Sequence, residues 1–204
     1  DEIEDAVRRY AEVAQVARDC GFTGVQVHAA HGYLISQFLS PVTNRRTDQW
    51  GGELRNRARF LLDVVTAVRA RAGDDFPLGV KLNSADFQQG GFTLQECVQV
   101  SRWLADMGVD LLEISGGNYE QPRLLGVEGK KTSYQQPASA STRRREAYFL
   151  EYAAAIRAEA SLPLMVTGGF RKRQYMADAV SKDECAVVGM GRPLCVDPDL
   201  PRGL

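Results

Sequence analysis

The chain alternates between two patterns of hydrophobic and polar positions. Hydrophobic residues recur at helical spacing over 3–17 and stop at Gly21, and a short apolar run then ends at His28 as in a strand. The same alternation predicts further helices over 60–68, 94–107, 143–160 and 175–180, and further strands over 78–82, 109–114, 164–167 and 186–189. Strands that alternate with helices are typical of a parallel sheet, so the pattern predicts an α/β fold.

The connections between these elements are unequal in length. Those from helix to strand are short, whereas those from strand to helix include the polar, Gly-rich stretches 32–55 and 115–142. Long loops after the strands are where a (β/α)8 TIM barrel builds its active site. The alternative is an open doubly wound sheet, but no G-x-G-x-x-G opens a helix after the first strand. Because five strands cannot close an eight-stranded barrel, we expect a partial barrel with earlier strands missing.

Composition places few further limits on the fold. With 44% hydrophobic and 25% charged residues, the 204 residues can bury one sizeable core, and we expect residues 1–204 to form a single domain. The chain starts at Asp1 without a methionine, and we expect both ends to be cut from a longer protein. A polar stretch over 121–140 is expected to be a mobile loop or a lid.

The net charge argues against nucleic acid and membrane partners, and the cysteines indicate the redox environment. A net charge of -1 and a pI near 6.2 give no electrostatic case for nucleic acid or an anionic membrane, and no apolar run is long enough to span a bilayer. The four cysteines are far apart and form no CxxC motif, which favours a reduced, cytoplasmic protein. The sequence leaves open whether the protein forms a homo-oligomer.

Both histidines of the chain, His28 and His31, lie where the first predicted strand passes into a Gly-containing loop. Since the chain has only these two histidines and both lie at the end of a predicted strand, we expect them to take part in binding or catalysis. A His-x-x-His pair can also bind a metal, but no Cys, Asp or Glu lies close by to complete a ligand set, so no metal is expected. The remaining alternative is two loop histidines that only satisfy backbone groups.

Two glycine motifs follow the last two predicted strands. They are Gly168-Gly169 after one strand and Gly191-Arg192 after the next. Glycine lets the backbone approach an anion closely, and arginine adds a two-pronged donor. A lone Gly-Gly is more often a turn than a phosphate site. Two such motifs on consecutive strands favour phosphate, because TIM barrels bind phosphate at the loops after strands 7 and 8.

Three further segments carry a resemblance to a known family. The segments 28–34, 37–41 and 44–52 closely resemble the old yellow enzyme family of FMN-dependent NAD(P)H:flavin oxidoreductases and ene-reductases. The similarity continues through Val80-Lys81-Leu82-Asn83, Gly168-Gly169 and Gly191-Arg192-Pro193. It implies that the chain supplies about strands 4 to 8 of an FMN-binding TIM barrel.

The resemblance also implies roles for individual residues. His28 and His31 would bind the carbonyl or nitro oxygen of the substrate, and Tyr33 would donate a proton to the neighbouring carbon, although a buried structural tyrosine is an alternative. Lys81 would face N1 and O2 of the flavin; it lies in a strand that holds no acidic residue to pair with it. Residues Gly168, Gly169, Gly191 and Arg192 would hold the FMN phosphate.

The remaining candidate residues are expected to have mainly structural roles. Ser115, Gly116 and Gly117 either line the substrate side or form a turn. Six polar or aromatic residues of the first long loop are expected to make structural ion pairs and packing contacts: Arg45, Asp48, Trp50, Arg55, Asn56 and Arg57.

Together these features predict a flavoenzyme. NAD(P)H would reduce FMN, and hydride would pass from flavin N5 to a small electron-poor substrate such as an activated alkene or a nitro compound. The alternative is a non-catalytic fragment or phosphate-binding half-barrel, because strands 1 to 3 are missing. We expect residues 1–204 alone to be inactive.

Overall fold

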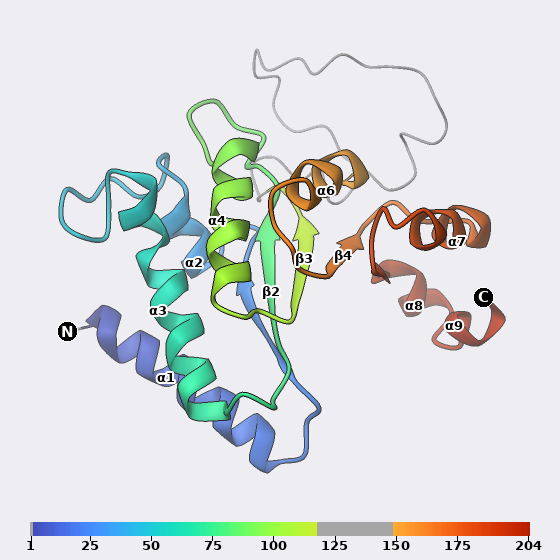
Figure 1. Ribbon diagram of the computed structural model, residues 1–204, viewed down its shortest axis with the longest axis horizontal. Helices are drawn as coiled ribbons and strands as arrows, with labels where there is room; N and C mark the ends of the chain where they lie inside the picture. The colour runs from blue at the N-terminus through green and yellow to red at the C-terminus, as the bar shows by residue number, and fades with distance from the viewer. Residues whose placement is uncertain (1, 118–148) are drawn as a thin grey trace.

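The computed structural model describes residues 2–117 and 149–204, and within them a curved parallel sheet forms the centre of the molecule (Figure 1). Neighbouring strands pair in sequence order, β1-β2-β3-β4-β5, and every pairing is parallel. The strands are β1 (Val25–Ala29), β2 (Leu78–Asn83), β3 (Leu111–Ser115), β4 (Leu164–Thr167) and β5 (Val187–Gly189). Each strand lies where the hydrophobic pattern predicts it, and the α/β class is confirmed.

Helices connect the strands and pack against one another in chain order. The longest are α1 (Glu2–Asp19), α3 (Leu54–Ala72) and α4 (Leu94–Asp106); α1 contacts α3, α3 contacts α4, and α4 contacts α6 (Leu150–Arg157). Four shorter helices complete the described part: α2 (Leu34–Leu39), α7 (Arg173–Ser181), α8 (Arg192–Val196) and α9 (Leu200–Gly203). A layer of helices along one side of a parallel sheet is the arrangement of a TIM barrel wall.

The hydrophobic core lies between the sheet and this helix layer. Val27, Val80, Leu112 and Leu164 occupy one level across four strands, and all are at most 4% exposed. Successive side chains of a strand point to opposite faces. The next level, His28, Lys81, Glu113, Met165 and Val187, therefore faces away from the helices. This inner face holds the chemistry.

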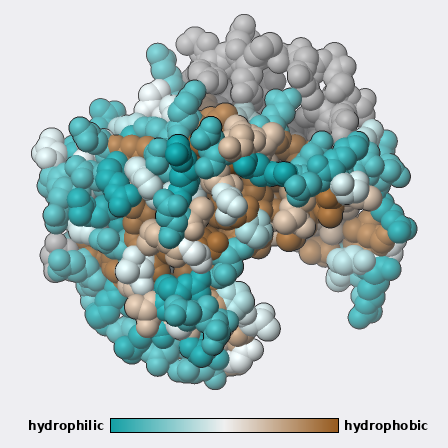
Figure 2. All heavy atoms as spheres, in the orientation of Figure 1, coloured by the Kyte–Doolittle hydropathy of each residue, from teal (hydrophilic) through white to brown (hydrophobic). Residues whose placement is uncertain are grey.

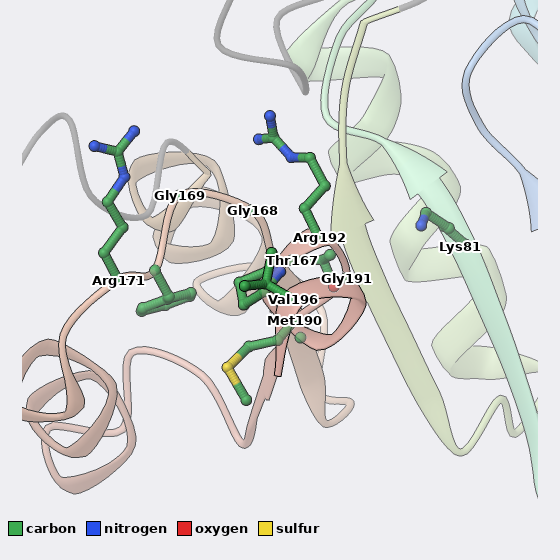
Figure 3. Close-up of a pocket in the computed structure, with 12 residues that line it drawn as sticks. Lys81, Thr167, Gly168, Gly169, Arg171, Met190, Gly191, Arg192 and Val196 are labelled. Carbon is green, nitrogen blue, oxygen red and sulfur yellow. The ribbon is translucent and has the colours of Figure 1, made fainter. Parts of the chain in front are cut away.

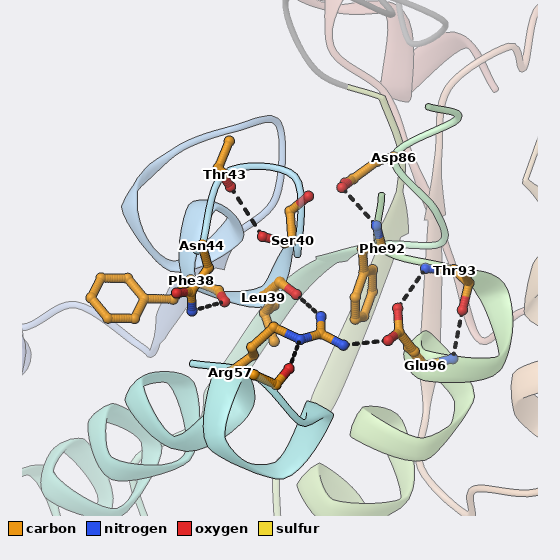
Figure 4. A network of polar contacts seen from close by, with 11 residues as sticks. Phe38, Leu39, Ser40, Thr43, Asn44, Arg57, Asp86, Phe92, Thr93 and Glu96 are labelled. Carbon is orange, nitrogen blue, oxygen red and sulfur yellow. Dashed lines mark hydrogen bonds and ion pairs between the residues drawn. The ribbon is translucent and has the colours of Figure 1, made fainter. Parts of the chain in front are cut away.

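The loop after β1 is fastened by Arg57, a buried residue of α3. Its guanidinium donates to the carbonyl oxygens of Leu39 and Gly52 and pairs with Glu96 of α4 (Figure 4). Glu96 also forms the predicted capping box with Thr93, accepting from the Thr93 backbone N–H at 3.0 Å. The structural interpretation of Arg57 is confirmed.

The other residues of this loop behave similarly. Trp50 is buried, its backbone N–H donates to Asp48 at 3.0 Å, and the Arg59 guanidinium lies over its ring. Arg45 donates to the carbonyl of Val42, and Arg55, which lies in α3 and not in the loop, stacks on Trp103 of α4. These contacts give the loop its shape. The candidate catalytic residues of the loop are His31 and Tyr33, which lie nearer β1.

Among the helices of the described residues, the sequence pattern misses three. α2, α8 and α9 have six, five and four residues, which is too short for a helical repeat of hydrophobic positions to stand out. The predicted helix over 143–160 is seen from Leu150 to Arg157, and its first part lies outside the described residues, as does the predicted loop over 121–140.

The curved sheet leaves one side of the molecule hollow. Figure 2 shows the hollow between the α1 side and the α8 and α9 side, with apolar surface along its edge beside α7 and α8. In the described part of the chain, β1 and β5 each pair with one neighbouring strand, and Val187 of β5 is 41% exposed. No helix among the described residues is long and apolar enough to cross a membrane. All four cysteines are free thiols.

Candidate active site

The two histidines lie at the end of β1, in a turn with unusual backbone geometry. His31 has a φ of 62° and Gly32 a φ of 78°, both in the left-handed region. A side chain other than glycine is uncommon there and costs conformational energy. The backbone N–H of His31 donates to Asn83 Oδ1 at 3.1 Å. Asn83 is itself buried and donates to Asp86 and to the carbonyl of Gly117, so a fixed amide holds the turn.

The three residues predicted to act on the substrate are in mutual contact. The His28 ring is packed edge-on against the His31 ring, with centroids 5.2 Å apart, and against the Tyr33 ring, with centroids 4.8 Å apart. Tyr33 is 47% exposed. The alternative of a buried structural tyrosine is therefore wrong, and Tyr33 lies at the surface beside the His28 ring.

Each imidazole has one nitrogen engaged by the protein. Nδ1 of His28 accepts the backbone N–H of Ala30 at 3.2 Å, and Nε2 of His31 lies 2.8 Å from the hydroxyl oxygen of Ser115 at the end of β3. Ser115 therefore lines the histidine site. Within residues 2–117 and 149–204, no hydrogen bond to another side chain engages the second ring nitrogen of either histidine.

The surroundings keep both histidines neutral at pH 7. Desolvation, then the positive charge of Lys81 and then His28, lower the pKa of His31 to about 4. Desolvation and Lys81 also lower the pKa of His28. A neutral imidazole keeps one N–H donor and one acceptor nitrogen. The pair can thus donate two hydrogen bonds to one oxygen without carrying charge.

Lys81 has an acidic partner that its own strand does not supply. Glu113 lies directly opposite on β3, and its carboxylate is 2.9 Å from the Lys81 ammonium. The Glu113 side chain is only 5% exposed and that of Lys81 is 18% exposed. The expectation of an unpaired lysine is wrong because it considered only the residues of β2, whereas the partner is set by strand register.

The glycine motifs line a pocket of about 530 Å³ together with Lys81 (Figure 3). Gly168 and Gly169 follow β4 with φ angles of 114° and 84°, and Gly191 caps the start of α8, where Arg192 begins the helix. Lys81 extends from β2 toward the side of the pocket where these motifs lie. The remaining lining residues are Thr167, Phe170, Arg171, Gly189, Met190, Pro193 and Val196.

Thr167 at the end of β4 marks this pocket as a place for a polar group. Its hydroxyl oxygen is buried and has no hydrogen-bond partner in the described part of the protein. A Cβ on Gly189 would lie 1.8 Å from that oxygen, so only glycine leaves the backbone this close. Buried hydroxyls normally have partners, so a ligand with polar oxygen atoms fits here.

The structure thus joins the predicted residues in two neighbouring groups. His28, His31 and Tyr33 form one, while Gly168, Gly169, Gly191 and Arg192 line the pocket that also contains Lys81. In register, Lys81 is the partner of His28, which connects the two. The sequence analysis gave no role to Asn83, Glu113 or Thr167, although Asn83 lies in the recognised segment 80–83 and Thr167 directly precedes Gly168. Among residues 2–117 and 149–204, no cluster of three His, Cys, Asp or Glu could hold a metal.

Comparisons with known proteins show the family of the chain. The family model described as NADH:flavin oxidoreductase / NADH oxidase matches residues 1–204. The chain is 42% identical over 205 residues to NADH-dependent flavin oxidoreductase iliE of Neonectria sp. (strain DH2), covering 98% of this chain and 26% of that protein. It is 39% identical to NADH-dependent flavin oxidoreductase iccE of Talaromyces variabilis, covering 99% of this chain and 48% of that protein.

Solved structures of the same kind share the fold. The old yellow enzyme homologue from Zymomonas mobilis matches with a TM-score of 0.76 and 28% identity, over 99% of this chain and 51% of its own. A 2-naphthoyl-CoA reductase complex matches with a TM-score of 0.84 and 33% identity, over 98% of this chain and 29% of its own.

The chain belongs to the NADH:flavin oxidoreductase / NADH oxidase family, to which old yellow enzyme relatives also belong. FMN, reduced by NAD(P)H, is the cofactor of this family. The chain spans about half, or less, of the length of the relatives it matches, and it corresponds to part of their TIM barrels.

Proposed function

We propose that this chain forms the substrate-binding and phosphate-binding part of an FMN-dependent oxidoreductase. The enzyme would use NAD(P)H to reduce an activated alkene, a nitro compound or a similar electron-poor small molecule. The observation that carries the proposal is the meeting of His28, His31 and Tyr33 at the end of β1, next to the strand whose Lys81 lines the glycine pocket.

The residues of the pocket fit FMN. The unpartnered Thr167 hydroxyl and the close backbone at Gly189 suit a ligand rich in oxygen atoms. Gly168, Gly169, Gly191 and Arg192 would hold the phosphate by backbone N–H groups and a guanidinium. Lys81 would offer its positive charge to N1 and O2 of the ring. FMN bound here would supply hydride transfer from N5 to the substrate.

The histidine group would act on the substrate oxygen. Negative charge develops on a carbonyl or nitro oxygen when hydride adds to the conjugated carbon. Neutral N–H donors of His28 and His31, fixed before the reaction, would stabilise that charge without having to reorganise. Tyr33 packs against His28 at the surface of the site, so its phenol would give its proton to the adjacent carbon.

Alanine variants of the histidines in the intact protein test this function. His28→Ala and His31→Ala should keep a normal FMN content but lose the charge-transfer band of a bound phenolate. Their rate of substrate reduction should fall about 10²-fold or more, the usual cost of removing one preorganised oxyanion donor. Arg45→Ala, in the same loop, is the control, because the Arg45 guanidinium donates to the carbonyl of Val42 and not to either histidine. Loss of FMN with unchanged phenolate affinity would assign the histidines to the cofactor instead.

The second candidate is a phosphate-binding half-barrel without catalysis. It is favoured by one observation: β1 and β5 each have one strand neighbour in the described part, so the inner face is open to one side. For residues 1–204 expressed alone we expect weak or no FMN binding, measured by flavin absorbance after gel filtration. Stoichiometric flavin with reductase activity would contradict this candidate.

A further inference from the structure

Ser115 is the only described residue that engages the His31 ring through a hydrogen bond. Its hydroxyl is fully buried at the C-terminal end of β3, 2.8 Å from His31 Nε2. Within the described residues no second hydrogen bond is seen for this hydroxyl. The nearby amide of Asn83 is already occupied by His31 N–H, Asp86 and the carbonyl of Gly117.

This arrangement decides which way the hydrogen bond runs. If Nε2 carried the proton, it would donate to Ser115, and the hydroxyl proton of Ser115 would be buried without an acceptor. If Nε2 is unprotonated, the hydroxyl donates to it and both groups are satisfied. Burial therefore favours the second arrangement, in which the proton of neutral His31 is on Nδ1.

His28 has the opposite arrangement. Its Nδ1 accepts the backbone N–H of Ala30, and a backbone amide can only donate, so that nitrogen has no proton. Neutral His28 therefore carries its proton on Nε2. The two imidazoles of the site use different nitrogens as donors.

We propose that the Ser115 hydroxyl is a positioning group that holds His31 as its Nδ1–H tautomer, so that His31 keeps an N–H for the substrate oxygen alongside Nε2–H of His28. The use of these donors rests on the proposed function, whereas the tautomers themselves do not. Without Ser115, His31 would be free to protonate Nε2, and the donor would move to the other edge of the ring.

Nitrogen NMR of the intact protein labelled with ¹⁵N-histidine measures the tautomers directly. His28→Gln and His31→Gln variants assign the signals. At pH 7 we expect protonated Nδ1 for His31 and protonated Nε2 for His28, and in Ser115→Ala we expect His31 to move toward the Nε2–H form. Ser84→Ala is the matched control, because Ser84 is a buried serine whose hydroxyl has no hydrogen-bond partner among the described residues. An Nε2–H tautomer of His31 in the wild type would overturn the proposal.

Ligand affinity then tests what the tautomer is for. With 4-hydroxybenzaldehyde as the probe, Ser115→Ala should weaken binding about tenfold, as expected for a group that orients another ligand-binding histidine, while Ser84→Ala leaves it unchanged. If the tautomer shifts in Ser115→Ala but affinity does not, Ser115 has no positioning role. If His31→Gln itself binds the probe as the wild type does, the proposed function fails although the tautomer assignment stands.

Discussion

The Lys81 ammonium and the Glu113 carboxylate form an ion pair across β2 and β3, with Nζ 2.9 Å from Oε1. Both side chains lie on the inner face of the sheet, and both are largely buried. The positive charge of Lys81 is therefore balanced by Glu113 of the neighbouring strand, although the sequence of β2 alone indicates an isolated lysine. Two consequences follow, one for stability and one for the cofactor.

The first prediction concerns stability. Lys81→Met leaves the buried Glu113 carboxylate without its partner and should lower the free energy of unfolding by about 3–5 kcal/mol, whereas the double variant Lys81→Met with Glu113→Leu should recover most of that loss. Urea unfolding of the single and double variants of the intact protein measures this. Arg46→Ala, which removes the exposed pair with Asp48, is the control and should change the stability little, because water and salt screen an exposed ion pair. If the losses of Lys81→Met and of Glu113→Leu alone add up to the loss of the double variant, the ion pair contributes nothing to stability.

The second prediction concerns the flavin. If Lys81 faces N1 and O2, Lys81→Met should lower the FMN reduction potential, and Glu113→Gln should raise it because the ammonium loses its counter-charge. A shift of about 30 mV requires only 1.4 kcal/mol in a two-electron couple. Lys81→Arg should keep most of the wild-type potential, since it keeps the charge. Spectroelectrochemistry gives the potentials. An unchanged potential in Lys81→Met with FMN fully bound would make the lysine a purely structural partner of Glu113.

Much of the fold follows from the sequence because hydrophobic periodicity is local. The strands, α1 and α4 begin and end close to the residues that the pattern indicates, and the Thr93–Glu96 capping box marks the start of α4 correctly. The helix predicted over 60–68 is longer in the structure, where α3 runs from Leu54 to Ala72. Short helices such as α2 escape this kind of analysis, since fewer than two turns do not establish a period.

The candidate site is less predictable, because its contacts cross strands. His28, His31 and Tyr33 are close in the sequence, so their proximity could be foreseen. Glu113 and Ser115 come close to Lys81 and His31 only through the register of parallel strands and the turn that follows β1, which no local pattern encodes.

The third prediction separates the glycines of the pocket. A Cβ at Gly189 would clash with the Thr167 hydroxyl, so Gly189→Ala should destabilise the protein by about 1–3 kcal/mol. A Cβ at Gly191 would meet no atom within 4 Å, so Gly191→Ala should keep the stability but weaken FMN binding, because the methyl group takes space next to the ligand. Gly203→Ala, which also meets no atom but lies outside the pocket lining, is the control. FMN affinity is measured by fluorescence titration; unchanged affinity in Gly191→Ala would place the phosphate elsewhere.

The last prediction uses the low pKa of His31. Desolvation and Lys81 lower it from an ordinary value of 6.5 to about 4 in the folded protein. Between these pH values the unfolded chain takes up a proton that the folded protein does not, so stability is complete above pH 6.5 and falls as the pH decreases toward 4. Because His31 is only half-buried, we expect solvent screening to limit this loss to about 1–2 kcal/mol. Urea unfolding at several pH values should show a shallower decline below pH 6.5 for His31→Gln than for the wild type. If stability falls equally with pH in the two proteins, the pKa of His31 is the same in the folded and the unfolded chain, and the prediction is wrong.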